Sequence, residues 1–590
     1  MLAALIKFSL IQRLFVLLFA IMIGGAGVHA FHNLPIDAFP DVSSTQVKVI
    51  IKAPGMTPEE VESRITARIE VEMLGIPNQV MLRAVAKYGL TDVTVDFAEG
   101  TDMYWARQQV SERLNAIWND LPGDISGGLA PLTTPLGEVF MFAIEGGDLS
   151  LTERRSLLDW VIRPILRTVP GVADVNSLGG SVRSFEVIPD NGNMAARGVS
   201  FEALKQALQN NNRNDGAGRL TEGEESLLVR AEGSVRSLED LNAIVIQNTK
   251  GVPIRLADVA QARIGELTRY GAVTRDGKEE TVTGLVLSLR GANARQVVNG
   301  VTAKLAELQP SLPKGVKIDV FYKRTDLINV AIYTVSKALI EAIVLVLVLL
   351  MLFLGDFRAA VTVAIILPLS ALVTFILMRK LGMSANLMSL GGLAIAIGML
   401  VDAAVVVIEN IVKHLADAQH QKSVLPRLHL IYRAVCEVAT PVTSGILIII
   451  IVFLPLLTLE GLEGKLFIPV AVTIVFALGG SLLLSLTVIP VIASYLLTKA
   501  SHDEPLLVRM CNYMYEPLLK FCLRNARLVL VLAGLSLLAT AWTYTKIGKT
   551  FMPTLDEGQH LIVQLEKLPS ITLEHSIAFD EKVQHAFVEK

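Results

Sequence analysis

The chain has 590 residues, of which 52% are hydrophobic and 18% charged, and its mean hydropathy is +0.51. This composition excludes a disordered chain and a soluble enzyme of ordinary composition. The formal net charge of −3, without any basic run, argues against nucleic acid as a partner. The three cysteines, Cys436, Cys511 and Cys522, show no paired spacing, and each is expected to be a free, buried thiol.

Apolar runs along the chain predict membrane-spanning helices. The first run, from Leu14 to Phe31, is longer than the core of a signal peptide and lacks a clear cleavage site, so we expect it to be retained. A spanning helix needs about 20 mostly apolar residues. By that criterion the sequence predicts seven helices, at 13–31, 334–354, 358–378, 387–412, 437–458, 467–497 and 527–545.

Lysine and arginine residues near the ends of these helices predict the orientation of the chain. Three basic stretches fall on one side, which is therefore expected to be cytoplasmic: the N-terminus, the loop 413–433 and the segment 499–527. The pair Arg379 and Lys380 is the exception. The segment 33–330 and the tail from about residue 550 are then expected to lie on the other side, in a periplasm.

The segment 33–330 has the pattern of a mixed α/β region. "TQVKVIIKAPG" predicts a strand, and "MTPEEVESRITARIEVEMLGIP" predicts a helix with Pro58 in its first turn. Two strands and a second helix follow. The strand–helix–strand–strand order recurs from "GEVFMFAIEGG" onward and ends with "SVRSFEVIPD". We expect two ferredoxin-like α+β units and an insertion at 182–270.

A longer repeat relates the two ends of the chain. "KFSLIQRLFVLLFAIMIGGAGVHAFHNLPIDAFP" at 7–40 aligns without a gap with "KFCLRNARLVLVLAGLSLLATAWTYTKIGKTFMP" at 520–553, at a constant offset of 513. The pattern of a strand and then a helix follows both stretches. Internal repeats of this kind are typical of transporters. We therefore expect one half of a duplicated architecture and a truncated start of the second.

Two acids interrupt the apolar stretch "AIAIGMLVDAAVVVIEN" at 394–410. Asp402 and Glu409 would share one face of a helix, about 10 Å apart along its axis. Each acid costs about 2.5–3.5 kcal/mol at the centre of a membrane on insertion scales, which favours a functional use such as proton uptake and release. Glu409 is expected nearer the interface, beside Asn410. Asn410 and Glu341 are accessory candidates, although simple hydration also fits Glu341.

Several stretches resemble the resistance–nodulation–division (RND) superfamily: "LPIDAFPDVSSTQVKV", "FLGDFRAA" and "GMLVDAAVVVIEN". The chain is most similar to the heavy-metal efflux branch, the inner-membrane pumps for cobalt, zinc and cadmium or for copper and silver. The resemblance implies an α-helical integral membrane protein of the bacterial inner membrane with a large periplasmic α+β porter domain. It implies a proton antiporter without a cofactor, acting as a homotrimer with a periplasmic adaptor and an outer-membrane channel. Asp402 and Glu409 would relay its protons.

On this resemblance the chain divides into eight parts. They are the first transmembrane helix (1–32), the periplasmic porter units (33–181), a docking-type insertion (182–270), the return of the porter domain (271–330), transmembrane helices two to six (331–500), a cytoplasmic amphipathic linker (501–526), the seventh transmembrane helix (527–546) and the truncated start of a second periplasmic repeat (547–590).

Departures from the family pattern bear on which metal the protein would transport. Ala396, Ile397 and Gly398 stand where many divalent-metal pumps have Asp-Phe-Gly, so one relay acid is missing, as in the copper–silver type. That type uses methionines in its second periplasmic half, whereas "HLIVQLEKLPS" has none. Met388 and Met399 are the metal-ligand candidates of the fourth span, but a methionine in a helix more often serves packing. A divalent metal such as zinc, cobalt, cadmium or nickel is favoured over copper or silver.

Other classes fit the sequence less well. The only "GKT" follows a membrane helix and lacks the first glycine of an ATP-binding loop. The 413–433 loop has no histidine pair of a zinc hydrolase, and its histidines are expected to be solvated: His414, His420 and His429. An enzyme is therefore not expected. Two alternatives stay open: an RND exporter of drugs or lipids, which usually has adjacent acids in its fourth span, and a non-transporting remnant, because family members are about twice as long.

Overall fold

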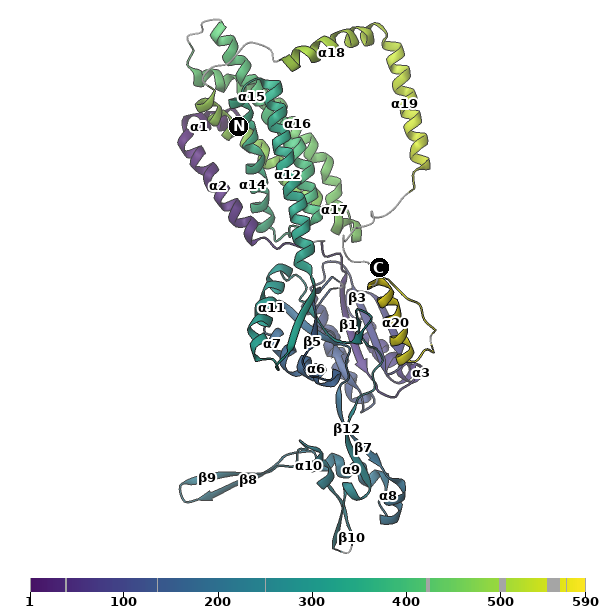
Figure 1. The fold of residues 1–590 in the computed structure, drawn as a ribbon. Helices are drawn as coiled ribbons and strands as arrows, with labels where there is room; N and C mark the ends of the chain where they lie inside the picture. The colour runs from purple at the N-terminus through teal and green to yellow at the C-terminus, as the bar shows by residue number, and fades with distance from the viewer. Residues whose placement is uncertain are drawn as a thin grey trace. The chain divides into compact units, whose positions relative to one another are not determined.

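The computed structural model describes residues 2–37, 40–134, 136–249, 251–420, 425–497, 506–548, 563–568 and 570–588 (Figure 1). The chain forms two compact units. The first comprises Met1–Gly137, Leu289–Val298 and Arg324–Ile562, and the second comprises Glu138–Ser288, Asn299–Lys323 and Val563–Lys590.

Seven helices in the described part of the chain are long and apolar enough to cross a membrane. They are α2 (Arg13–Asn33), α12 (Arg324–Leu354), the pair α13 (Phe357–Ala364) and α14 (Ile366–Lys380), α15 (Leu387–His420), α16 (Arg427–Phe453), α17 (Gly461–Leu496) and α19 (Ala526–Lys546). Each coincides with one predicted helix, while the crossing itself stays a prediction. Two shorter helices, α1 (Leu2–Ile11) and α18 (Leu506–Arg524), precede α2 and α19.

Several helices extend past the predicted ends. α12 begins at Arg324 rather than at 334, and α16 begins at Arg427 rather than at 437. α15 continues to His420, so the predicted loop 413–433 is wrong, and its histidines belong to α15 and α16. The reason is physical: an apolar run marks only the part of a helix that suits a membrane, whereas each further polar residue can still add one backbone hydrogen bond.

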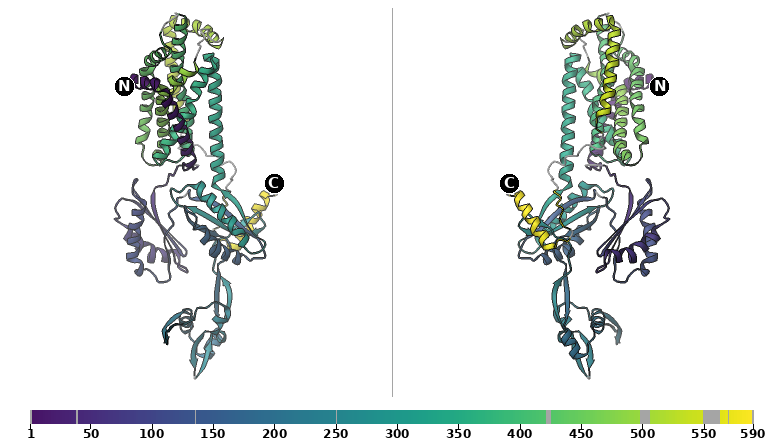
Figure 2. Two further views of the ribbon diagram at one scale, coloured as in Figure 1. Left: turned by 90° about the vertical axis from the view of Figure 1, so that its left-hand side faces the viewer. Right: turned by 90° about the vertical axis from the view of Figure 1, so that its right-hand side faces the viewer.

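Most of the apolar helices share one core. Buried residues that contribute to it come from α1, α2, α12, α13, α14, α15, α16 and α17, among them Ile6, Val363, Val407, Ile431 and Ile489. α12 lies at the edge of this bundle (Figure 2), and only 6% of its apolar window is buried. α19 has no buried residue. The described apolar helices therefore differ greatly in how much of their surface is covered.

The cysteines fit the prediction in part. Cys436, Cys511 and Cys522 are all free. Cys436 and Cys522 are half-buried, but Cys511 is exposed on α18, so the expectation of a buried thiol is wrong there. Residues 509–521 of α18 are all exposed, so this part of the helix has no packed side that could bury Cys511.

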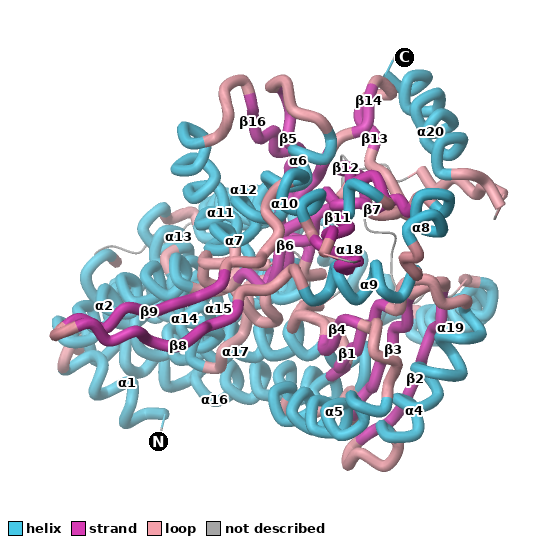
Figure 3. The backbone as a smooth tube through the Cα atoms, turned by 90° about the horizontal axis from the view of Figure 1, so that it is seen from below, coloured by secondary structure: helices cyan, strands magenta, loops and turns pink. Residues whose placement is uncertain are grey.

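The first α+β unit is a four-stranded antiparallel sheet with helices on one face (Figure 3). Its strand order is β2-β3-β1-β4, formed by β1 (Thr45–Lys52), β2 (Gln79–Lys87), β3 (Leu90–Phe97) and β4 (Ser126–Leu129). The helices are α3 (Pro58–Val61), a π-helical turn (Glu62–Thr66), α4 (Ala67–Met73) and α5 (Met103–Ile117). Alternate residues of β1, Val47, Val49 and Ile51, are buried against these helices, as the two-residue period of a strand requires.

The second sheet has the corresponding order, β16-β5-β15-β6. Its strands are β5 (Glu138–Gly146), β6 (Val172–Leu178), β15 (Val282–Ser288) and β16 (Val316–Lys323), and its helices are α6 (Leu151–Leu157), a π-helical turn (Leu158–Ile162), α7 (Arg163–Leu166) and α11 (Ala294–Leu308). The prediction that "SVRSFEVIPD" continues this unit is wrong. That segment, β7 (Arg183–Pro189), pairs with β12 (Ala260–Glu266) instead, because β15 occupies the place between β5 and β6 that β3 occupies between β1 and β2.

The β7–β12 ribbon joins the insertion to the second sheet (Figure 1). The insertion contains α8 (Asn191–Arg197), α9 (Phe201–Asn210), α10 (Leu238–Ala243) and two hairpins, β8 (Asp215–Glu222) with β9 (Glu225–Ala231) and β10 (Val245–Thr249) with β11 (Val252–Arg255). A small apolar core of its own includes Leu204, Leu241 and Leu256. The inserted residues therefore have an apolar core of their own within the second compact unit.

The terminal repeat is visible in the helix boundaries. α19 begins at 526 against 13 for α2 and ends at 546 against 33, so both ends are displaced by 513 residues. The last helix, α20 (Leu573–Val588), lies against the small hairpin β13 (Thr274–Arg275) and β14 (Glu279–Glu280), where Gln584 Nε2 donates to Thr274 Oγ1 at 2.8 Å. The strand expected between α19 and α20 falls on "LIVQLEKLPS" at 561–570. Residues 563–568 of this stretch form no strand, so the prediction is wrong there, while 561, 562 and 569 lie outside the described residues.

Candidate functional site

The predicted acid-bearing helix is α15, and local sequence explains where it starts. Asn386 Oδ1 accepts from the Ser389 amide, and the Asn386 amide donates to Ser389 Oγ, both at 2.9 Å. This reciprocal arrangement satisfies amides that the first turn of a helix leaves without partners. With 34 residues, α15 is about 51 Å long at about 1.5 Å per residue. It therefore exceeds the hydrocarbon thickness of a bilayer, about 30 Å.

One face of α15 is packed against α17. Ala403, Ala404 and Val407 are buried on this face, and Ser481 Oγ of α17 donates to the Leu400 carbonyl oxygen at 3.2 Å. At Gly392, a Cβ atom would lie 2.8 Å from the Val470 carbonyl oxygen of α17. Small residues thus allow the two helix backbones to approach closely, as is typical of helices packed in membranes.

The two predicted relay acids lie on the opposite face. Asp402 and Glu409 are both exposed, together with Ile395 and Val406. Neither carboxylate has a hydrogen bond or ion pair with any residue that the structure describes. Their spacing along the helix axis is about 10 Å. If the hydrocarbon begins at Leu387, Asp402 lies about 22 Å along the axis and Glu409 about 33 Å, at the far edge of a core about 30 Å thick.

A polar group lies at this far end of α15 and includes Glu437, which sequence analysis missed. Asn410 Nδ2 donates to the Ala434 carbonyl oxygen of α16 at 2.8 Å and lies 3.4 Å from Glu437 Oε2. The same Glu437 oxygen is 2.7 Å from His414 Nε2. Glu437 sits in the apolar run "AVCEVATPV", and an acid in such a run was the available signal. Asn410 and His414 are four residues apart, so both face α16.

The other candidates do not join this group. Glu341 forms an ion pair of 3.8 Å with Lys337 one turn earlier on α12, and both side chains are largely exposed. Met388 and Met399 are half-buried on α15 and about 16 Å apart along its axis, too far to share one ion. No cluster of three or more histidine, cysteine, aspartate or glutamate side chains that could hold a metal occurs among the described residues. The metal ligands thus stay unassigned.

Comparison with known proteins gives the family. The model of the AcrB/AcrD/AcrF family matches residues 5–590. The chain belongs to this family. It is 40% identical to the cobalt-zinc-cadmium resistance protein CzcA of Cupriavidus metallidurans, over 98% of this chain and 55% of that protein. It is 37% identical to the cation efflux system protein CusA of Escherichia coli, over 98% of this chain and 56% of that protein.

A solved structure supports the same assignment. The crystal structure of a heavy metal efflux pump superposes with a TM-score of 0.86 at 33% identity, covering 99% of this chain and 56% of that one. The predicted membership of the heavy-metal branch of the RND superfamily is thereby confirmed. The chain spans about half the length of the curated relatives it matches.

Proposed function

We propose that this chain is part of the inner-membrane subunit of a proton-driven exporter of heavy-metal cations. The observation that carries the proposal is the outward face of α15, where Asp402 and Glu409 stand without a described partner on an otherwise apolar helix. A carboxylate in such a position can bind and release a proton without breaking an existing contact. The similarity to CzcA and CusA supports metal cations as the cargo.

In this proposal the roles of the acids follow their depth. Asp402 is the principal proton carrier, because it lies well inside the membrane-spanning part of α15. Glu409 passes protons at the predicted cytoplasmic edge, close to the Asn410, His414 and Glu437 group. Glu341 is an accessory at most. We favour a divalent metal over copper or silver, because the methionines of α15 are too far apart to hold a soft ion together.

The soluble parts support the rest of the assembly. The strand orders β2-β3-β1-β4 and β16-β5-β15-β6 are both those of a β-α-β-β-α-β sandwich, and we assign the two sheets as periplasmic, ferredoxin-like porter units. The body between β7 and β12 would be the docking region of a homotrimer that works with a periplasmic adaptor and an outer-membrane channel. The N-terminus would be cytoplasmic.

Metal tolerance tests this function. The 590-residue chain, and the same chain completed with a second half, are each expressed with the adaptor in a metal-sensitive strain. Growth is scored on zinc, cobalt, cadmium, nickel, copper and silver. Protection by the completed chain against divalent metals is the expected result. Protection against no metal by either chain would overturn the metal assignment and leave drugs or lipids as the next substrates to test.

A further inference from the structure

The stretch that connects α2 to β1 contacts several other parts of the first compact unit. Ile36 pairs with Ala385 in the α14–α15 loop as an isolated bridge. Arg324 at the start of α12 donates from Nε to Asp37 Oδ1 at 3.0 Å, and its side chain is only 6% exposed. Further along, Arg290 Nε donates to Asp41 Oδ2 at 2.9 Å. This conspicuous "LPIDAFPDVSS" stretch therefore ties the first sheet to several membrane helices.

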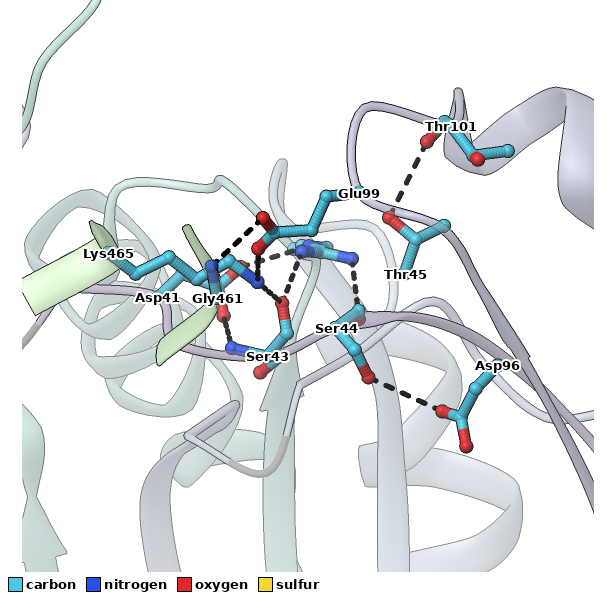
Figure 4. A network of polar contacts seen from close by, with 10 residues as sticks. Asp41, Ser43, Ser44, Thr45, Asp96, Glu99, Thr101, Gly461 and Lys465 are labelled. Atoms are coloured by element: carbon cyan, nitrogen blue, oxygen red, sulfur yellow. Dashed lines mark hydrogen bonds and ion pairs between the residues drawn. The ribbon is translucent and has the colours of Figure 1, made fainter. Parts of the chain in front are cut away.

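Glu99 joins the first sheet to α17. It lies in the loop directly after β3, and its Oε1 is 3.1 Å from Lys465 Nζ of α17 (Figure 4). Its Oε2 accepts from the Gly461 amide, the first residue of α17, at 3.3 Å. Lys465 Nζ also donates to the Ser43 carbonyl oxygen at 2.9 Å. A carboxylate thus sits at the N-terminus of a long helix, where the helix dipole and the exposed amide both favour negative charge.

The part of α17 that Glu99 holds is set apart from the rest of the helix. Pro469 lies inside α17. Because proline has no amide hydrogen, the Lys465 carbonyl oxygen loses its usual intrahelical partner at this point. The segment Gly461–Ile468 can therefore bend relative to the remainder at low cost. Below Pro469, α17 is packed against α15 through Ser481, Leu400 and Gly392, as described above.

A cavity gives this segment room to move. Its volume is about 320 Å³, and its lining comes from the connecting stretch, the Glu99 loop, the α14–α15 loop and the start of α17, including Asp41, Glu99, Met383, Asn386, Lys465 and Pro469. The acids that line it are already bound to Lys465 and to Arg290. The cavity therefore lacks an unmatched charge that would call for a ligand, and it leaves space beside the first turns of α17.

We propose that Glu99 and Lys465 form a coupling joint, through which movement of α17 against the acid-bearing α15 is passed to the β2-β3-β1-β4 sheet. This inference rests on the proposed function and adds two positioning residues to it. The contact is half-exposed, with 50% of the Glu99 side chain and 27% of the Lys465 side chain accessible. Such a pair adds little to the free energy of folding. We therefore assign it the role of transmitting the position of α17 to the sheet.

The test measures metal flux and proton flux at the same time in proteoliposomes that contain the full-length pump. A metal indicator and a pH indicator are enclosed in the vesicles. Glu99→Gln and Lys465→Met remove the ionic contact, and Lys465→Arg keeps a cation there. We expect the metal moved per proton to fall by about fivefold or more, the low end of usual coupling between sites, in the first two variants. Lys465→Arg is expected to keep the wild-type ratio.

The matched control is Glu72→Gln, which removes an ion pair of 3.4 Å with Arg113 that lies wholly within the first sheet and its helices. It should leave the ratio unchanged. An unaltered ratio of metal to protons in Glu99→Gln, whether or not both fluxes fall, would overturn the joint. A purely structural role would lower both fluxes in the same proportion. Failure of the wild-type pump to move metal would instead overturn the proposed function.

Discussion

Three acids of the first compact unit differ in whether their carboxylates have hydrogen-bond partners. Asp402 and Glu409 project from α15 without a hydrogen bond or ion pair to any described residue. Glu99, near the opposite end of the same bundle, accepts from both Lys465 and the Gly461 amide. A carboxylate with two fixed donors is suited to holding a position, whereas one without a fixed partner can exchange a proton without disturbing the fold. In our proposals, this difference separates the residues that would carry protons from the residues that would transmit movement.

The strongest test of this comparison is the variant Asp402→Asn in the full-length pump. The change removes the proton-binding group but preserves size, and the side chain lies on the uncovered face, so packing against α17 is retained. We expect export to fall to the background of empty vesicles, with normal expression and trimer formation. Metal efflux driven by a pH gradient measures this. Wild-type-like metal resistance in that variant would contradict the relay role.

Glu409→Gln should have a smaller effect. In the proposed function Glu409 lies at the far edge of the spanning part of α15, where water could replace a missing proton carrier. The same efflux measurement is expected to show a reduced but readily detectable rate. A greater loss here than in Asp402→Asn would reverse the order of importance, and with it the argument from depth.

Sequence predicted the acid face well because its evidence is local. A spacing of seven residues fixes a common face on any straight helix, and all seven long apolar runs became helices. The helix ends were less predictable, since the polar turns at Arg324 and Arg427 continue helices that hydropathy alone would start later.

Contacts between distant segments were not predictable in the same way. The Glu437–His414 pair joins residues 23 apart, and the Glu99–Gly461 bond joins residues 362 apart. No periodicity in a single sequence links such positions. The prediction that β7 belongs to the second sheet was wrong for a similar reason. The place beside β6 is taken by β15, which comes more than 90 residues after β7 in the chain, and β7 pairs with β12 instead.

Glu437→Gln tests whether an exposed acid that pairs α15 with α16 matters mainly for stability. It replaces the charged acceptor of His414 while Asn410 keeps its bond to Ala434. The Glu437 side chain is 62% exposed, so water can solvate the group that replaces it. We expect only a small loss of stability, measured by unfolding in detergent, and little loss of export. The matched control is Glu341→Gln, whose longer ion pair of 3.8 Å runs along one helix and should cost less. A loss of export as severe as that of Asp402→Asn would place Glu437 among the proton carriers.

The smallest expected effect is the pH dependence of the Glu99 contact. The hydrogen bond from Lys465, followed by that from the Gly461 amide, holds the pKa of Glu99 below its ordinary value of 4.5. The folded chain therefore favours the charged form, and the contact adds its full stability above the ordinary pKa and loses it as the pH falls through the lowered one. Wild type should melt slightly higher than Glu99→Gln at neutral pH, and the gap should close in acid and shrink with added salt. A gap that widens as the pH falls would show that Glu99 is not held as a carboxylate, and the contrast with Asp402 would then lose its physical basis.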